Sequence, residues 1–475
     1  MPKRTIEIPE GMEQFGDAIE AVLKRMREFE GTAAKDGEPV NFSEFEQAID
    51  DATDAARLDV KRRALQRLDI NAKHILVDGD RYAQVGRYEA PYFTKEGEVK
   101  ITRSLYRECG KRNGKTVDTV SLRAGAVDGW LPMAAKVAAF LLQQGTSREA
   151  EATARAFGAL PYSRSSFERV THAVGVLHSV ARDEVEEQLI ATSVIPDKAQ
   201  GLSIALDRVS VPFEEPRARP RGRPKKGAAK RPVKRVWHMA YTGTVTLHDG
   251  NGDALHTIRY GRTPQLGCED LLQRMLADVK ELLRRQPSLN VAVLSDGAFE
   301  LEDALDRVFT DAALGVTVHR GIDFWHVIEK LGAAARIIHG SAAAPIVERW
   351  KLLLRNSGTG PRRILNELYA SGKRQVCTGL DNDRPVHNAI TYLENHGARM
   401  NFPAALAAGL PIGSGNVEAT CKSLFGQRLV RTGARWKEET AQHIVDLRAY
   451  ALSGRLDAAL SLTLAPLIRQ VRLAA

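Results

Sequence analysis

The sequence predicts an α/β protein whose mixed sheet lies in the middle of the chain, between largely helical regions. Three observations predict this class. An apolar run of strand character occupies 203–211, strand and helix signals alternate from 201 to 319, and residues 8–70, 126–196 and 327–400 follow helical rather than strand patterns. The length of 475 residues suits two to four domains with ample material for cores.

We expect residues 1–72 to form an N-terminal helical region. Apolar residues from Phe15 to Met26 recur near the 3.6-residue period, which predicts a helix over 11–27. A second helix is expected from about Asn41 to Leu68. It ends in a basic patch, which is either an ordinary solvated face or a DNA-contacting one; its members are Lys61, Arg62, Arg63 and Arg67.

Residues 73–125 are predicted to form a small β-rich module, because 82–92 and 98–106 alternate between apolar and polar residues. Cys109 stands where a zinc ribbon would carry a Cys-x-x-Cys pair, but it has no partner cysteine nearby. We therefore predict a degenerate zinc-ribbon-like module without zinc. The four cysteines are far apart in sequence, which indicates a reducing, cytoplasmic setting.

Residues 126–197 are expected to be helical. Two short helices, over about 146–157 and 163–170, flank a turn near Gly158. This pattern is typical of a DNA-binding helix-turn-helix and equally of a plain helical hairpin.

Positive charge is concentrated in one short insert. The chain has a net charge of +9, and residues 214–235 hold ten Lys/Arg against two Glu, which leaves the rest of the chain at +1. A cationic arm of this kind points to a polyanion such as DNA. Its Pro-Arg-Gly-Arg-Pro core resembles the AT-hook, which reads the minor groove; a basic linker touching phosphates is the alternative. The candidate DNA-binding residues here are Arg219, Arg221, Gly222, Arg223, Lys225 and Lys226.

The element order from 198 to 326 predicts an RNase H-like catalytic domain. After the first strand come strands at 236–246 and 254–260, a helix at 269–286, a strand at 291–295, a helix at 300–309 and a strand at 314–319. Three antiparallel strands followed by parallel strands alternating with helices characterise that fold. We expect a helical insertion at 327–400 and the second catalytic part, helical from 416 onward, at 401–475.

Three acids stand on the elements that such a fold brings together. Asp207 lies in the first strand, Asp296 ends the strand at 291–295, and Glu418 opens a later helix. Clustered carboxylates can hold two Mg²⁺ or Mn²⁺ ions for phosphodiester chemistry. The alternative is that each acid simply faces solvent. His326, three residues after Asp323, is either a structural histidine or a further site residue.

Four motifs resemble those of DDE transposases from bacterial insertion sequences, in the ISKra clade, with an Asp-x-x-His element similar to that of Mutator-like and hAT-like transposases. They are the Asp207 strand ending in Val211-Pro212, Ser295-Asp296-Gly297-Ala298, Asp323-Phe324-Trp325-His326, and 410–419 running into 421–428. Two departures are Arg208, where the family usually has Gly, and the missing zinc pair near Cys109.

The resemblance implies a transposase that binds terminal inverted repeats, nicks the ends and joins them to target DNA. Asp207, Asp296 and Glu418 would be the metal ligands, and His326 would assist near the scissile phosphate. Arg428, Arg431 and Arg435 would contact the DNA backbone. Double-stranded DNA and a second copy of the chain are the expected partners. We expect a cytoplasmic, nucleoid-associated bacterial protein without a membrane span. The alternatives are a DNA-binding regulator without chemistry and a nuclease without strand transfer.

Overall fold

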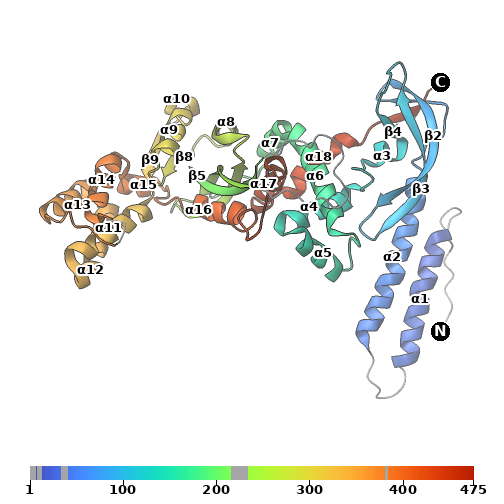
Figure 1. The fold of residues 1–475 in the computed structure, drawn as a ribbon, viewed down its shortest axis with the longest axis horizontal. Helices are drawn as coiled ribbons and strands as arrows, with labels where there is room; N and C mark the ends of the chain where they lie inside the picture. The colour runs from blue at the N-terminus through green and yellow to red at the C-terminus, as the bar shows by residue number, and fades with distance from the viewer. Residues whose placement is uncertain (1–6, 8–12, 34–40, 216–233, 380–382, 475) are drawn as a thin grey trace. The chain divides into compact units, whose positions relative to one another are not determined.

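The computed structural model describes residues 7, 13–33, 41–215, 234–379 and 383–474. The chain divides into two compact units (Figure 1). Unit 1 comprises 1–181 together with 460–475, and unit 2 comprises 182–459. In the described part of the chain, no helix is both long and apolar enough to cross a membrane.

Unit 1 contains an antiparallel sheet in the order β10-β1-β2-β3-β4. The predicted strands at 82–92 and 98–106 are present as the long hairpin β2–β3. The strands are β1 (His74–Val77), β2 (Asp80–Phe93), β3 (Glu98–Glu108), β4 (Thr116–Asp118) and β10 (Val471–Leu473). Helix α2 packs against β3, and Leu65 of α2 shares a buried cluster with Tyr92 of β2 and with Val99 and Ile101 of β3.

The helices of unit 1 include the two predicted at its beginning. They are α1 (Glu13–Ala33), α2 (Phe42–Gln66), α3 (Thr119–Ala124), α4 (Pro132–Gln144), α5 (Ser147–Ala156), α6 (Arg164–Val180) and the short turn η4 (Ala465–Leu467). Helices α5 and α6 correspond to the pair expected around Gly158, and a capping box at Thr146 and Glu149 starts α5. Whether this pair binds DNA stays a prediction.

The end of the chain differs from the expectation of continuous helix. Residues 471–473 form β10, which pairs antiparallel with β1. The exposed edge of β1 offers unpaired backbone groups, and the returning chain satisfies them.

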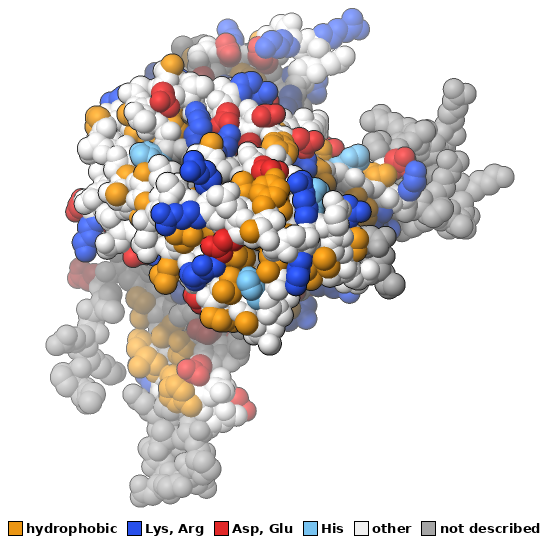
Figure 2. Space-filling view, turned by 90° about the vertical axis from the view of Figure 1, so that its left-hand side faces the viewer, with side chains coloured by type: hydrophobic (Ala, Val, Ile, Leu, Met, Phe, Trp, Pro, Cys, Tyr) orange, Lys and Arg blue, Asp and Glu red, His pale blue; other side chains and the backbone are white. Residues whose placement is uncertain are grey.

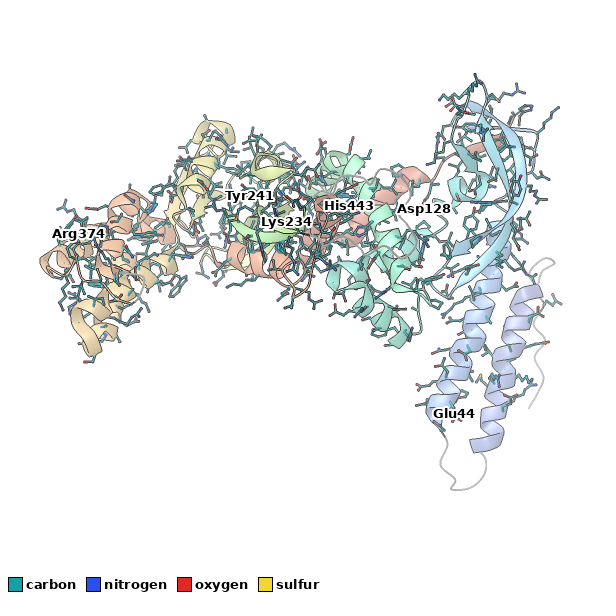
Figure 3. The ribbon with its side chains drawn as sticks, viewed as in Figure 1. Glu44, Asp128, Lys234, Tyr241, Arg374 and His443 are labelled. Carbon is teal, nitrogen blue, oxygen red and sulfur yellow. The ribbon has the colours of Figure 1, made fainter. Side chains whose placement is uncertain are left out.

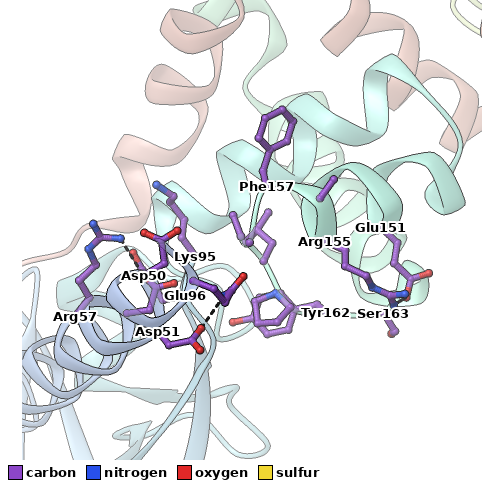
Figure 4. Close-up of a pocket in the computed structure, with 17 residues that line it drawn as sticks. Asp50, Asp51, Arg57, Lys95, Glu96, Glu151, Arg155, Phe157, Tyr162 and Ser163 are labelled. Carbon is purple, nitrogen blue, oxygen red and sulfur yellow. Dashed lines mark hydrogen bonds and ion pairs between the residues drawn. The ribbon is translucent and has the colours of Figure 1, made fainter. Parts of the chain in front are cut away.

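Unit 1 also has an open groove of about 950 Å³ between α2 and the α5–α6 turn (Figure 4). Carboxylates outnumber cations in its lining. The acids are Asp50, Asp51, Asp54, Glu96 and Glu151, against Arg57, Lys95 and Arg155. Since these carboxylates repel phosphates, the groove is not suited to the DNA backbone.

Unit 2 is built on a five-stranded mixed sheet in the order β7-β6-β5-β8-β9. The predicted sequence of three antiparallel strands followed by parallel ones is confirmed: β5, β6 and β7 pair antiparallel, and β8 and β9 join in parallel beside β5. The strands are β5 (Gly201–Glu214), β6 (Arg235–His248), β7 (Ala254–Arg262), β8 (Asn290–Ser295) and β9 (Val318–Ile322). Tyr241 lies in β6, and Lys234 directly precedes this strand (both labelled in Figure 3).

Helices α7 (Arg182–Ala191), α8 (Gly267–Arg285), α9 (Phe299–Val308) and α10 (Asp311–Leu314) accompany this sheet. A core cluster joins Ile204 and Leu206 of β5 to Leu271, Met275 and Leu301 of the helices. The strand expected at 314–319 begins later, at Val318. The reason is that Thr310 caps α10 and Gly315, at φ +71°, ends it.

The predicted helical block after 326 is present. It consists of α11 (Phe324–His339), η1 (Gly340–Ala342), α12 (Ala343–Asn356), α13 (Gly360–Ala370), α14 (Pro385–His396), η2 (Gly397–Arg399) and α15 (Phe402–Ala407). These helices share a core around the fully buried Trp350. On the face that Figure 2 presents, Lys and Arg side chains are interspersed with hydrophobic ones.

The last part of unit 2 carries α16 (Gly415–Cys421), the π-helical turn η3 (Lys422–Gly426), α17 (Glu438–Leu452) and α18 (Leu456–Leu464), which runs into unit 1. Helix α17 packs on β7 and is joined to it by buried charges. Arg262 of β7 donates to Glu186 at 3.0 Å and lies 3.6 Å from Asp446 of α17. Because each buried charge has a partner, its desolvation cost is offset.

Candidate active site

The sheet register sets Asp207 beside Asp296. In the parallel pair β5–β8, Gly201 pairs with Asn290 and Ala205 with Leu294, an offset of 89 residues. Asp207 and Asp296 are separated by the same 89 residues. Extending the register two positions past the last pair therefore brings these two acids opposite each other, where β8 ends at Ser295.

Helix α16 brings Glu418 to the same face of the sheet. Val417 of α16 packs in one cluster with Ala205, Ala292 and Leu294. Side chains two residues apart on a strand share a face, so Asp207 lies on the face of Ala205 that α16 covers. Helix α16 contacts both β5 and β6 (Figure 1). The three acids thus come from the middle of β5, from the residue that follows β8 and from the helix that packs on this face.

The electrostatics of Asp207 reflect this proximity. Burial raises the pKa of Asp207 above its ordinary value, and the charges of Asp296 and Glu418 raise it further. Hydrogen bonds from the Cys421 thiol and from the Arg208 amide oppose that rise. The three carboxylates therefore repel one another within one local environment, which is the setting that a bound cation relieves.

The residues present fit a divalent metal in donor type and backbone placement, because hard cations take carboxylate oxygens. As the side chains stand, each has a local partner. Asp296 Oδ1 accepts from Ala298 N at 3.0 Å, and Glu418 Oε1 accepts from Lys422 Nζ at 2.9 Å. Across the described ranges, no three His, Cys, Asp or Glu side chains are grouped closely enough to hold a metal ion. Metal binding requires these carboxylates to turn toward one another.

Asp323 connects three segments around the acids. Its backbone N donates to Ser295 O at 2.8 Å, next to Asp296. Its Oδ2 accepts from both the backbone N and the hydroxyl of Ser414, the latter at 2.8 Å, just before α16. Its Oδ1 caps α11 by accepting from His326 N at 2.9 Å. Burial alone would raise the pKa of Asp323, but these hydrogen bonds outweigh it and lower the pKa to about 2.

His326 lies close to the acids. Its Nδ1 is 3.2 Å from Asp323 Oδ1. This contact, together with the charges of Asp296 and Glu418, raises the pKa of His326 above its ordinary value against the effect of burial. Because Nδ1 faces Asp323, Nε2 is the ring nitrogen left to meet a ligand.

The helical block supports the turn that follows Asp296. Tyr392 of α14 donates from its hydroxyl to Asp296 O at 2.9 Å. Gly297 has φ +97°, and a Cβ there would come within 2.8 Å of the Tyr392 ring. Only glycine satisfies both conditions, which explains the Asp-Gly pair in this motif.

Arg208 points away from the acids. Strand alternation turns its side chain to the opposite face, where its guanidinium forms an ion pair with Glu300 of α9. The unusual residue after the first acid therefore leaves the face of Asp207 clear.

The predicted arginines near α16 differ in their surroundings. Arg428 is buried, and its guanidinium lies 4.7 Å from the Trp436 ring centre. Arg431 and Arg435 are exposed. Trp436 also holds the end of β5, because Glu214 N donates to Trp436 O at 2.7 Å. Contact of these arginines with DNA stays a prediction, and the six candidate residues from Arg219 to Lys226 lie outside the described residues.

The sequence grouped the three acids with His326 as a predicted site, but it did not reveal the hydrogen bonds that Asp323, Ser414 and Tyr392 make around them. An Asp between the end of a strand and the start of a helix is an N-cap signal, and this signal could have identified Asp323 as the residue that caps α11. Nothing in the sequence marks Tyr392, because its contact depends on how α14 folds back.

Comparison with known proteins adds little. No protein-family model matches the chain, and no curated protein matches it. A solved structure described as the Drosophila P element transposase strand transfer complex aligns with 71% of this chain and 83% of its own, at 12% identity and a TM-score of 0.25. A TM-score this low supports no argument about this chain, so the interpretation depends on the chain's own residues.

Proposed function

We propose that this chain is a DDE transposase with an RNase H-like catalytic sheet. The observation that carries the proposal is the shared offset of 89 residues between the β5–β8 register and the Asp207–Asp296 pair, with Glu418 on the helix that covers the same face. The strand order, with β5 central and β8 parallel beside it, supports the fold assignment. The four sequence motifs support the family.

In the proposed mechanism, Asp207, Asp296 and Glu418 would hold Mg²⁺ or Mn²⁺, with two ions per site. Such ions activate the attacking oxygen and stabilise the leaving oxygen in phosphodiester transfer. His326, oriented by Asp323, donates from Nε2 to a phosphate oxygen beside the scissile bond. Its raised pKa favours the cationic form that attracts phosphate.

The proposed substrate is double-stranded DNA at the terminal inverted repeats and at the target. Arg431 and Arg435 are exposed beyond the helix that carries Glu418, where they can meet the backbone. The cationic insert at 214–235 supplies most of the electrostatic attraction, because it holds eight of the nine net positive charges.

The test uses DNA that carries the inverted repeats flanking the native gene. Wild-type chain should cut these ends and join them to target DNA when Mg²⁺ is added. Asp207→Asn and Glu418→Gln should each lose cleavage by at least about 1000-fold while still binding DNA. The control is Asp303→Asn, an exposed acid of α9, which should cut normally. Cleavage at the wild-type rate by either Asp207→Asn or Glu418→Gln would contradict the proposal.

The same assay separates the alternatives. A protein that binds the ends but never cuts them is a regulator without chemistry. A protein that cuts but does not join pre-cut ends to target DNA is a nuclease without strand transfer.

A further inference from the structure

Helix α14 carries two stacked rings that reach the turn after β8. Tyr392 and His396 are four residues apart, so they share one face of the helix. Their ring centres lie 4.7 Å apart. His396 also stacks on Phe299 at the start of α9, with ring centres 5.2 Å apart and an angle of 29° between the planes. Because the Tyr392 hydroxyl donates to Asp296 O, this stack ends on the backbone of one of the three acids.

A buried acid and base fix the far end of the stack. His396 and Glu302 of α9 are 3% and 4% exposed, and His396 Nδ1 lies 3.3 Å from Glu302 Oε1. Apart from this contact, neither atom has a hydrogen-bond partner among the residues that the structure describes. A buried carboxylate oxygen without a donor is costly, so the imidazole carries a proton on Nδ1, facing Glu302. The His396 ring therefore cannot turn away without leaving Glu302 Oε1 unpaired.

The turn after β8 is supported from inside and from outside. Within it, Gly297 N donates to Ser295 Oγ and Ala298 N donates to Asp296 Oδ1, each at 3.0 Å. From outside, the Tyr392 hydroxyl holds Asp296 O at 2.9 Å. The bond from Ala298 occupies the carboxylate and must break when that carboxylate turns toward a metal ion. The bond from Tyr392 reaches the backbone oxygen, so it can persist.

The Tyr392 hydroxyl is suited to this lasting contact. Burial raises the pKa of Tyr392 above its ordinary value, and the charges of Asp296, Asp323 and Glu302 raise it further. The hydroxyl thus keeps its proton and remains a donor. Leu393, the next residue of α14, is buried in the core of the helical block. The packing of that block therefore determines where the hydroxyl lies.

We propose that Glu302 and His396 are positioning residues, which act through Tyr392 to hold the turn from which the Asp296 carboxylate reaches a metal ion. Glu302 holds His396 in place, His396 supports the Tyr392 ring, and the Tyr392 hydroxyl fixes the backbone of Asp296. The metal ion in this inference rests on the proposed function, whereas the hold on the turn can be tested without metal.

The first test is calorimetric titration of the full chain with Mn²⁺. Tyr392→Phe keeps the ring and removes the donor to Asp296 O, and His396→Phe keeps the stack but leaves Glu302 without its donor. Each should weaken Mn²⁺ binding by about 10-fold, because partners that orient metal ligands typically contribute that much to affinity. The double variant should bind no more weakly than the weaker single variant, since both changes act on one contact.

The matched control is Tyr369→Phe, which removes the same atom from an exposed tyrosine of α13 whose hydroxyl donates to Glu394. This variant should bind Mn²⁺ as wild type does. If Glu302 and His396 served stability alone, His396→Phe would lower the urea midpoint and leave the Mn²⁺ affinity unchanged.

Hydrogen exchange without metal gives a readout that does not depend on the proposed function. The amides of Gly297 and Ala298 should exchange about 5-fold faster in Tyr392→Phe and in His396→Phe than in wild type, but not in Tyr369→Phe. A wild-type chain that binds no Mn²⁺ contradicts the proposed function, and the exchange rates then decide this inference by themselves. The inference is overturned by wild-type exchange at 297–298 in His396→Phe, by unchanged affinity of both variants in a chain that binds Mn²⁺, or by effects of the two substitutions that add.

Discussion

Asp323 offers the sharpest test of how the site is assembled, and Asp323→Asn is the perturbation. The carboxylate is 4% exposed, and it accepts hydrogen bonds from both Ser414 and His326. Asparagine keeps the shape but replaces one acceptor oxygen with an NH₂ group that faces donors. We therefore expect the variant to lose hydrogen bonds on one side whichever way its amide turns.

The magnitude follows from the pKa of Asp323, which falls from 3.8 to about 2. Each pKa unit corresponds to about 1.4 kcal/mol, so the folded state favours the ionised form by about 2 kcal/mol. One unsatisfied donor adds about 1–3 kcal/mol. We expect Asp323→Asn to destabilise unit 2 by about 3–5 kcal/mol at pH 7. Because the folded pKa is depressed, the wild-type advantage should fade as pH falls from about 4 to about 2.

The assay is urea unfolding followed by tryptophan fluorescence, with hydrogen exchange of 412–421 as the local readout. Ser414→Ala should cost about 1 kcal/mol, and the double variant should cost less than the sum, because both changes remove the same contact. Glu300→Gln is the control, since its ion pair with Arg208 is exposed and should matter by less than about 1 kcal/mol. Asp323→Asn unfolding within about 0.5 kcal/mol of wild type, with unchanged exchange at 412–421, would refute the reasoning.

Two further predictions concern the sheet of unit 2. Burial raises the pKa of Asp278 from 3.8 to about 6 despite Arg274, so its contribution to stability is full below pH 3.8 and is lost as pH rises through about 6. Between pH 4 and pH 7, the unfolding free energy of Asp278→Asn, measured in urea, should therefore rise by about 3 kcal/mol relative to that of wild type. Equal pH dependence of the two proteins would contradict this. A Cβ at Gly261 would lie 2.5 Å from Val445 Cγ1, so Gly261→Ala should weaken the packing of α17 and lower stability by about 1–3 kcal/mol. An unchanged urea midpoint would contradict this, because it would mean that Val445 can move aside without cost.

The strands were predictable because their signals are local, and the three acids could be proposed as a set because each stands on or beside such an element. The run at 203–211 and the alternation after 235 mark β5 and β6 without reference to the rest of the chain. The spacing of 89 residues between Asp207 and Asp296 can be read from the sequence, whereas the matching register of β5 and β8 comes from the structure. The element order alone therefore suffices to group the acids as a predicted site.

What the sequence did not reveal depends on contacts between distant residues. Asp323 and Ser414 are 91 residues apart, and Tyr392 reaches Asp296 from a helix 96 residues away. Strand β10 is three residues long, too short for alternation to be recognised, and it exists because β1 supplies an edge. The ion pair of Arg208 likewise joins it to Glu300, 92 residues away.

The central claim, that Asp207, Asp296 and Glu418 form one metal-holding site, is tested most directly by calorimetric titration of the full chain with Mn²⁺. The account predicts saturable binding by the wild-type chain that weakens by at least about 10-fold in Asp207→Asn and in Glu418→Gln, but not in Asp303→Asn. Absence of saturable binding by the wild-type chain, or equal binding by all four proteins, would contradict it.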